Sequence, residues 1–332
     1  MRFQRTPGMQ PLPLPERGGT IEALRPFLNV AASDFVLVVA FLLAALHPWG
    51  PYPIFDVVAE QGTGKTSLLR ILRSLTDPHV VASCALPLSG RDLFIAARNT
   101  HLQTFSNVST LSNAMSDHLC GLADGGGLRI RTLFSDAAET HFRGARPIAL
   151  EGIANVVSRP DFQERALIFQ LERLPAYRTE RELLHAFDRQ RASIFGALLD
   201  ILVHGLEMLP VTRLVSPPRM ADFAYWAVAC GLDRFEEAYA ANRQSAILVM
   251  LSHDPVAKAV RALVARRRRW RGTMEDLLDV VGPTAGIRST RKLSDDLRRL
   301  TPMLRTVGVH IVYEQRTAEQ RLFRIERIEE KK

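Results

Sequence analysis

Apolar and polar positions divide the chain into two patterns. Up to about residue 178, short apolar runs alternate with segments whose apolar residues recur at helical spacing. From residue 179 onward the spacing is helical almost throughout, until two short alternating runs close the chain at 309–328. The first pattern is typical of a parallel sheet covered by helices, and the second of a helical region that ends in a β-hairpin.

The first part of the chain predicts a regular succession of strands and helices. Strands are expected at 55–59, at 77–83, at 101–107, within 128–152 as a hairpin and a core strand, and at the end of 159–174. Helices are expected at 35–46, from Lys65 to about 75, at 90–100, at 110–124 and at the start of 159–174. This alternation indicates an α/β nucleotide-binding domain.

The run "FDVVAEQGTGKTSLLRIL" is a strand, a glycine-containing loop and a helix in immediate succession. It matches the phosphate-loop pattern G-x-x-x-x-G-K-[ST], with Ala59 at the first glycine position. Gly62 and Gly64 allow the backbone to curl so that its N–H groups face phosphate oxygens, and the following helix adds the positive end of its dipole. Lys65 would then reach the β- and γ-phosphates, and the Thr66 hydroxyl would bind Mg²⁺. The alternative is a GKT triplet that occurs by chance in an ordinary strand–turn–helix.

This loop therefore predicts a site for ATP and Mg²⁺. Its expected nucleotide-binding residues are Glu60, Gln61, Gly62, Thr63, Gly64, Lys65, Thr66 and Ser67.

Composition narrows the class of protein. The chain has 332 residues, of which 47% are hydrophobic, enough for a substantial core and about two domains. Cys84, Cys120 and Cys230 form no C-x-x-C pair, which argues against a zinc site or a disulfide framework and favours a reducing, cytoplasmic setting. The start is rich in Pro and Gly and is expected to be a flexible lead-in without a signal peptide. The most apolar stretch, 35–46, is too short for a membrane span of about 20 residues and predicts a buried helix.

The positive charge is concentrated in the last quarter of the chain. Residues 1–255 carry 24 basic and 25 acidic side chains, whereas residues 256–332 carry 19 basic and 10 acidic ones. Such asymmetry indicates an anionic partner for the C-terminal part, with nucleic acid as the first candidate. The alternative is a basic surface that is merely solvated.

The C-terminal pattern predicts a winged-helix-like domain. Two helices, at 272–281 and 289–308, are each opened by a Thr or Ser that is a candidate N-cap, and a hairpin follows at 309–328. In a winged helix the second of these helices enters a DNA groove and the hairpin lies along the backbone. The alternative is a helical cap whose β-ribbon packs only against the ATPase.

Four basic residues of this second helix region are the expected nucleic-acid contacts: Arg288, Arg291, Lys292 and Arg298. The preceding run "ARRRRWR", at 265–271, is expected to be either a linker that contacts phosphates or a solvated segment.

The combined pattern predicts an α/β fold in which a P-loop NTPase core is followed by a helical lid and a C-terminal winged-helix-like domain. The expected segments are a flexible lead-in at 1–30, the ATPase core at 31–178, the lid or connector at 179–264 and the basic domain at 265–332.

The order of these features resembles the helicase portion of phage and plasmid primase–helicases, the superfamily-three-like ATPases within the AAA+ group, and bacterial and phage "ATP-binding proteins" built on that portion. The matching pieces are "PYPIFDVVAEQGTGKTSLLRILRSLTDP", "RDLFIAARN", "LSNAMSDHLCGLADGGGLRIRTLFSD" and "PPRMADFAYWA". With the basic tail, the likeness spans most of residues 35–328. The phosphate loop is specific by itself, and the other pieces match by order and spacing.

Relatives of this kind form rings, often hexamers, with ATP between neighbouring subunits and DNA in the central channel. The resemblance implies that Arg129 and Arg131, in "GGGLRIRTLF", project toward that channel. It implies that Arg159 or Arg165, in "SRPDFQER", is the finger that reaches a neighbour's γ-phosphate, and that Arg219, in "PRMADF", is the sensor-like arginine of the lid. For each arginine, a surface or structural ion pair is the alternative.

Two catalytic positions depart from the family pattern. Ser106 stands at the end of "HLQTFSN", where relatives carry the Asp that holds the Mg²⁺ shell, and a neutral serine cannot supply that charge. Glu151, in "PIALEGI", stands where relatives carry the Asn that positions the attacking water; it can act as a base or metal partner, or instead repel the γ-phosphate. Glu60 and Asn107 are further candidates to replace the missing acid. Because that acid is missing while Lys65 and the loop backbone are present, the loop is expected to bind nucleotide and to hydrolyse it slowly.

The leading hypothesis is an ATP-binding, helicase-like protein of phage or mobile-element DNA replication with weakened hydrolysis. It implies DNA and a homo-oligomeric ring as partners, with a primase or other replication proteins on separate chains. The alternatives are a nucleotide-dependent DNA-binding or ring-assembly protein without turnover, and a structural subunit of a mixed ring. No G-x-S-x-G or H-E-x-x-H motif points to another catalytic class.

Overall fold

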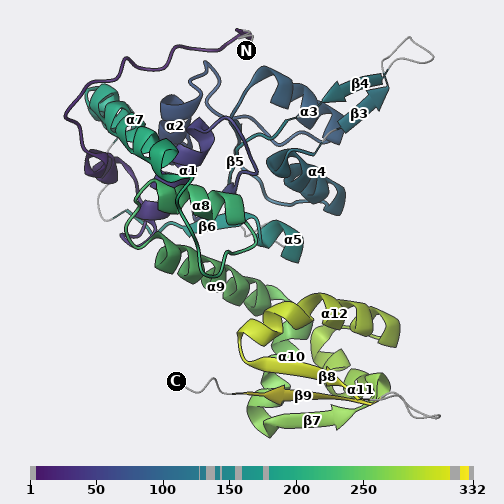
Figure 1. Cartoon of the computed structure of the whole chain (residues 1–332). Coiled ribbons are helices and arrows are strands. Elements are labelled where there is room, and N and C mark those ends of the chain that lie inside the picture. The colour runs from purple at the N-terminus through teal and green to yellow at the C-terminus, as the bar shows by residue number, and fades with distance from the viewer. Residues whose placement is uncertain are drawn as a thin grey trace. The chain divides into compact units, whose positions relative to one another are not determined.

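The computed structural model forms two compact units, Met1–Asn242 and Arg243–Lys332 (Figure 1). Its described residues are 5–126, 128–131, 139–142, 144–153, 159–174, 179–314 and 322–328, with only the backbone described at 128–131 and 139–142. Each unit has its own apolar core. The finer division into a lead-in, a core, a lid and a basic domain stays a prediction.

A four-stranded parallel sheet lies at the centre of the first unit. Its strands are β1 (Ile54–Val58), β2 (Gln103–Phe105), β5 (Ile148–Gly152) and β6 (Ala166–Gln170), in the order β2-β5-β1-β6. The four strands are buried along nearly their whole length, as expected for a parallel sheet that helices cover on both faces. A mixed α/β unit with a parallel sheet, as the sequence predicts, is thus confirmed.

Helices cover both faces of this sheet. They are η1 (Ile21–Phe27), α1 (Phe35–Leu46), α2 (Lys65–Thr76), α3 (Gly90–Asn99), α4 (Asn113–Asp124), α5 (Pro160–Gln163), α6 (Glu180–Asp188), α7 (Arg191–Met208) and α8 (Ala221–Ala229). In Figure 1, α1, α2, α7 and α8 lie on one side of the sheet and α3 and α4 on the other. The apolar helix α1 is buried on nearly every side, and its Phe41 ring lies 4.9 Å from the ring of Phe55 on β1. This contact fixes α1 against the strand that precedes the phosphate loop.

The predicted hairpin is present as a separate antiparallel pair, β3 (Leu128–Arg131) with β4 (Glu139–Phe142). The side chains of Arg129 and Arg131 lie outside the described residues, so their predicted contact with DNA stays a prediction.

The second unit packs three helices against a three-stranded antiparallel sheet. The helices are α10 (Pro255–Arg267), α11 (Met274–Ala285) and α12 (Thr290–Thr306), and the strands are β7 (Arg269–Gly272), β8 (Val309–Tyr313) and β9 (Phe323–Arg327) in the order β7-β9-β8. Helix α9 (Phe235–His253) leads into this unit. The predicted N-caps are confirmed, because the side chains of Thr273 and Ser289 accept hydrogen bonds from the first turns of α11 and α12.

The structure differs from the sequence-based expectations at two places. Residues 77–83 form no strand. Within them His79 makes an isolated bridge to Met9, Cys84 just beyond them makes another to Phe105, and Val80 and Val81 are exposed. The run at 265–271 is not a linker, although its arginines are exposed to solvent, as one of the two alternatives expected. It contains the end of α10 and most of β7, where Trp270 is buried in the core of the second unit between two exposed arginines.

Candidate functional site

The loop between β1 and α2 turns through two glycines in the left-handed region. Gly62 has φ +78° and Gly64 has φ +85°, a conformation that glycine adopts without strain. Gly64 is the N-cap residue of α2 and has no side chain to offer to the first turn. The first N–H groups of a helix lack partners within the helix, and its dipole favours negative charge there. The start of α2 is therefore suited to an anion.

Contacts from outside the loop hold it in this shape. The Thr63 side chain is 1% exposed, and its hydroxyl donates to the backbone oxygen of Glu60 at 3.0 Å. The side-chain amide of Asn29 donates to the backbone oxygen of Thr63 at 2.9 Å and to that of Glu172 at 2.7 Å. Asn29 thus joins the loop to the segment after β6. The sequence alone does not single out Asn29, because nothing in its local pattern separates it from an ordinary loop asparagine.

Lys65 folds back over its own loop. Its ammonium nitrogen donates to the backbone oxygens of Ala59 at 2.7 Å and Glu60 at 2.6 Å. Burial lowers the pKa of Lys65, and the charge of Glu151 opposes this shift. The positive charge is therefore held at the centre of the loop by acceptors that a triphosphate can replace.

Glu151 approaches the start of α2 from the neighbouring strand. The Thr66 hydroxyl lies 3.0 Å from one oxygen of the Glu151 carboxylate and 3.2 Å from the other. Glu151 is 2% exposed. Burial raises the pKa of this carboxyl, while the Thr66 hydrogen bond and the charges of Lys65 and Arg70 act in the opposite direction. The site thus combines an ammonium, a hydroxyl and a carboxylate at one edge of the sheet.

Ser106 lies farther from the loop in the sheet than Glu151 does. It follows β2, which pairs with β5 and not with β1, and the register aligns Phe105 with Leu150. The Ser106 backbone N–H donates to the Cys84 oxygen at 2.9 Å. Asn107 is exposed and has φ +56°. The strand that carries Glu151 therefore stands between Ser106 and the phosphate-loop strand.

Two other polar residues of the loop region form ion pairs or hydrogen bonds nearby. Glu60 pairs with Arg173 at 2.7 Å, with both side chains mainly exposed. The Ser67 hydroxyl donates to the Glu180 carboxylate at 3.2 Å, which also pairs with Arg70 at 3.0 Å.

The three arginines that the family resemblance singled out lie close to carboxylates of their own chain. Arg159 donates to the backbone oxygen of Asn113 at 3.0 Å and pairs with Asp117. Arg219 is half exposed and pairs with Glu164 at 3.1 Å and Asp161 at 3.3 Å.

Arg165 differs from the other two because it is buried. Its guanidinium binds Asp124 through two nitrogens and also pairs with Asp161. Burial disfavours the charged form, but the hydrogen bonds to both aspartates outweigh it and raise the pKa of Arg165. These contacts favour a structural ion-pair role in the single chain.

The basic residues predicted to contact nucleic acid lie on an exposed face of the second unit. Arg288, Arg291, Lys292 and Arg298 are all exposed, whereas the opposite face of α12 buries Leu293 and other apolar residues. Arg298 pairs loosely with Asp295, at 3.8 Å. This arrangement leaves the beginning of α12 with a positive face.

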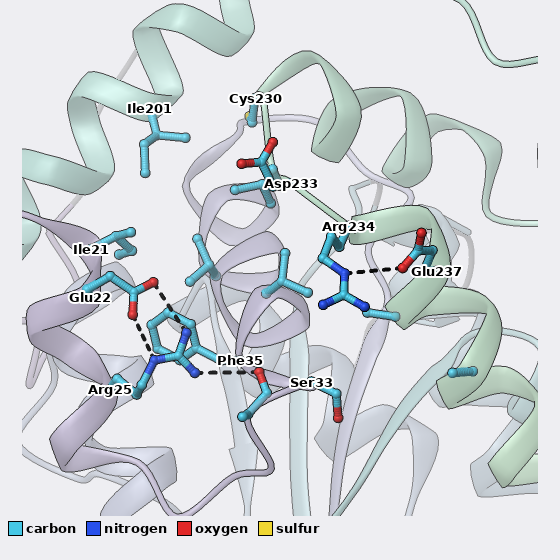
Figure 2. A pocket seen from close by; sticks show the side chains of 17 residues that line it. Ile21, Glu22, Arg25, Ser33, Phe35, Ile201, Cys230, Asp233, Arg234 and Glu237 are labelled. Carbon is cyan, nitrogen blue, oxygen red and sulfur yellow. Dashed lines mark hydrogen bonds and ion pairs between the residues drawn. The ribbon is translucent and has the colours of Figure 1, made fainter.

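A pocket of about 680 Å³ opens between η1, the start of α1, α7 and the start of α9 (Figure 2). Phe35 and Ile201 contribute to its apolar lining, and two ion pairs, Glu22 with Arg25 and Arg234 with Glu237, lie at its edge. None of the residues that line it belongs to 59–67 or to β5. The pocket is therefore distinct from the candidate site at the phosphate loop.

The described residues contain no group of three or more His, Cys, Asp or Glu side chains placed to hold a metal ion. Among the helices of this same part of the chain, none combines the length and the apolar character that crossing a membrane requires.

The sequence profile of a family described as "Actinomycete integrative conjugative element replication protein" matches residues 21–251, and the profile described as "AICE RepA C-terminal domain" matches residues 256–332. No curated protein matches the chain. Among solved structures, an apo form of the NrS-1 C-terminal region is similar at 15% identity and a TM-score of 0.46, over 98% of this chain and 79% of the other. The structure titled "SCCmec type IV Cch - active helicase" is similar at 10% identity and a TM-score of 0.49, over 93% of this chain and 70% of the other.

Both TM-scores lie below 0.5. The first profile alone covers more than half of the chain. The protein therefore belongs to the family of actinomycete integrative conjugative element replication proteins.

Proposed function

We propose that the protein binds ATP with Mg²⁺ at residues 60–67 and acts as a helicase-like protein in the replication of a mobile genetic element. One observation carries the nucleotide site: two left-handed glycines lead directly into a helix whose first residue is Lys65. The family to which the chain belongs supplies the replication context.

The loop's own groups account for triphosphate binding. The Lys65 ammonium now donates to two loop carbonyls, and it can exchange them for the more strongly accepting oxygens of a phosphate. The first N–H groups of α2 add donors and the positive end of the helix dipole.

The residues beside Lys65 fit a magnesium ion. Mg²⁺ prefers oxygen ligands and is commonly held by one or two protein groups together with substrate phosphates. Thr66 and Glu151 present a hydroxyl and a carboxylate within hydrogen-bonding distance of each other. When bound, the ion would neutralise charge on the phosphates, and these two residues would hold it.

The sheet order supports the assignment of the first unit to the P-loop NTPases, as the superfamily-three-like resemblance implies. The phosphate-loop strand β1 lies inside the sheet, between β5 and β6, and the loop follows its carboxyl end. Ligands of open α/β sheets bind at that edge.

The topology of the second unit supports a winged helix that binds DNA. Three helices and the antiparallel order β7-β9-β8 are the parts that this motif requires, and α12 presents Arg291 and Lys292 on its exposed face. A net positive charge in this quarter of the chain favours phosphate contacts.

A ring assembly is part of the same proposal. Arg159 and Arg219 are accessible enough to reach a neighbouring subunit's nucleotide if they leave their own carboxylates. Arg165 fits that role less well because it is buried between two aspartates. The molecular mass of the protein in solution, measured with and without an ATP analogue, tests this part. A monomer under both conditions would exclude the ring.

Titration of a fluorescent ATP analogue tests the nucleotide site. The wild type is expected to bind, and Lys65→Ala to lose at least tenfold in affinity because the main counter-charge of the phosphates is gone. Lys258→Ala, which removes an exposed lysine of α10, is the matched control and is expected to bind as the wild type does. Equal binding by all three proteins would exclude the proposed site.

A second candidate function is a nucleotide-dependent DNA-binding or assembly protein without turnover. The neutral Ser106, at the position where relatives carry an acid, favours it. Steady-state ATP hydrolysis with and without single-stranded DNA separates the two. Turnover that Lys65→Ala abolishes supports the enzyme, and nucleotide binding without turnover supports the second candidate.

A further inference from the structure

Glu151 is placed one strand closer to the phosphate loop than the position where the acid is missing. β5 lies between β1 and β2, and the register sets Glu151 opposite Val57, one residue before the end of β1. A side chain at this point of β5 needs to cross only one strand spacing to reach the start of α2. Ser106 follows β2, on the far side of β5.

The Glu151 carboxylate meets the hydroxyl expected to bind the metal. Both carboxylate oxygens accept from Thr66, at 3.0 and 3.2 Å, and the contact joins residues 85 positions apart in the chain. Lys65 and Arg70 are the positive charges that act on this carboxylate, and Glu180 adds a negative charge. The two positive charges offset only part of the cost of burying this carboxylate.

Burying a carboxylate is unfavourable unless its charge is compensated. A neutral amide would satisfy the Thr66 hydroxyl equally well, since an amide oxygen also accepts hydrogen bonds. The hydrogen bond to Thr66 alone therefore does not require a charged side chain at position 151. A divalent cation held beside Thr66 would supply the compensation that the burial requires.

We propose that Glu151 supplies the metal-shell carboxylate that Ser106 lacks, so that the Mg²⁺ site is completed from β5 instead of β2. This inference rests on the proposed nucleotide site. Glu151 and Thr66 together position the metal. Ser106, which follows β2, takes no part in holding it.

The other groups able to replace the missing acid are less well placed. Glu60 is turned toward solvent, where it pairs with Arg173. Asn107 is neutral and exposed. Of the groups considered for this role, Glu151 alone accepts a hydrogen bond from Thr66 in the described part of the chain.

The test is the affinity of the nucleotide-loaded protein for Mg²⁺. Protein saturated with a fluorescent ATP analogue is titrated with Mg²⁺, and analogue binding is also measured in EDTA. In Glu151→Gln, the affinity for Mg²⁺ is expected to fall ten- to hundredfold, the usual range for losing a group that supports a metal. Binding in EDTA is expected to stay within about threefold of the wild type, because Lys65 and the loop backbone are unchanged.

Two further variants make the result specific. Glu207→Gln, the same change at an exposed position of α7, is the matched control for charge removal and is expected to behave as the wild type. Ser106→Ala is expected to leave the Mg²⁺ affinity unchanged. Melting curves establish that each variant is folded.

Each outcome bears on a different statement. Wild-type Mg²⁺ affinity in Glu151→Gln overturns the inference, and so does a loss in Ser106→Ala as large as that in Glu151→Gln. If the wild type binds no analogue even in EDTA, the nucleotide site itself is wrong and the inference falls with it.

Discussion

The side-chain amide of Asn29 lies 2.9 Å from the backbone oxygen of Thr63, and the same nitrogen donates to the backbone oxygen of Glu172 at 2.7 Å. Asn29, which lies in the segment between η1 and α1, thus connects the phosphate loop with the chain that follows β6. The loop's curvature depends on a contact between segments far apart in the sequence, and not only on its glycines.

Asn29→Ala removes both hydrogen bonds and is expected to weaken binding of an ATP analogue by about five- to twentyfold. Each lost bond is worth about 0.5–1.5 kcal/mol, and a loop without these ties must be ordered by the nucleotide itself. Fluorescence titration measures the change. Asn99→Ala, where the amide only bonds to Ile95 of its own helix, serves as the control. Unchanged affinity in Asn29→Ala would show that the loop keeps its shape without this residue.

Asp56 predicts an unusual dependence of stability on pH. It lies on the central strand β1, is 1% exposed, and its Oδ2 has no hydrogen-bond partner among the described residues. Burial raises the pKa of this carboxyl to about 7. The folded protein therefore holds a proton that the unfolded chain releases above about pH 4, and stability falls as pH rises between these values, by up to about 1.4 kcal/mol per pH unit.

In Asp56→Asn this titration is absent. Between pH 5 and pH 8, the unfolding free energy of the wild type is expected to fall by roughly 2–3 kcal/mol relative to that of the variant. Urea unfolding at the two pH values measures the difference, with Glu207→Gln as the control that keeps Asp56. Parallel curves for wild type and Asp56→Asn would mean that Asp56 is ionised in the folded protein.

The local part of the site could be predicted from the sequence, and its long-range part could not. Strand, glycines, Lys65 and Thr66 follow one another in the chain, so their geometry is set by neighbours in sequence. The resemblance drew attention to Ser106 and Glu151 as departures from the pattern. Which of the two meets Thr66 depends on β5 pairing between β1 and β2, a contact across 85 residues that no local pattern encodes.

The error at 77–83 has a related cause. Val80 and Val81 give this segment the appearance of a strand, but strand formation needs a partner ladder and burial, and both residues are exposed. In the run at 265–271, the abundance of arginine concealed Trp270, whose burial makes the segment part of a sheet.

Arg165 and Arg159 are expected to respond differently to substitution. Arg165→Met leaves Asp124 and Asp161 without their shared partner and is expected to destabilise the first unit by about 2–4 kcal/mol. Arg159→Ala removes a more exposed pair with Asp117 and is expected to cost less than about 1 kcal/mol. Thermal and urea unfolding of the two variants decide this. If Arg165→Met unfolds like the wild type but loses ATP turnover, a direct role at a neighbour's nucleotide would be the better assignment.

Arg291 and Lys292 are expected to govern the salt dependence of DNA binding. They are exposed at the beginning of α12, whose other face buries Leu293 and Leu297, so replacing them by alanine should leave the fold intact. Each phosphate contact that is lost lowers the slope of log affinity against log salt by about 0.9 on duplex DNA. The double variant is therefore expected to bind DNA less tightly at low salt and with a slope smaller by about 2.

Arg305→Ala is the control, because Arg305 is an exposed arginine at the other end of the same helix. It distinguishes a contact made by the beginning of α12 from an attraction that depends only on the net charge of the second unit. If Arg305→Ala changes the slope per removed charge as much as the double variant does, the second unit attracts DNA by its net charge and the beginning of α12 is not its contact surface.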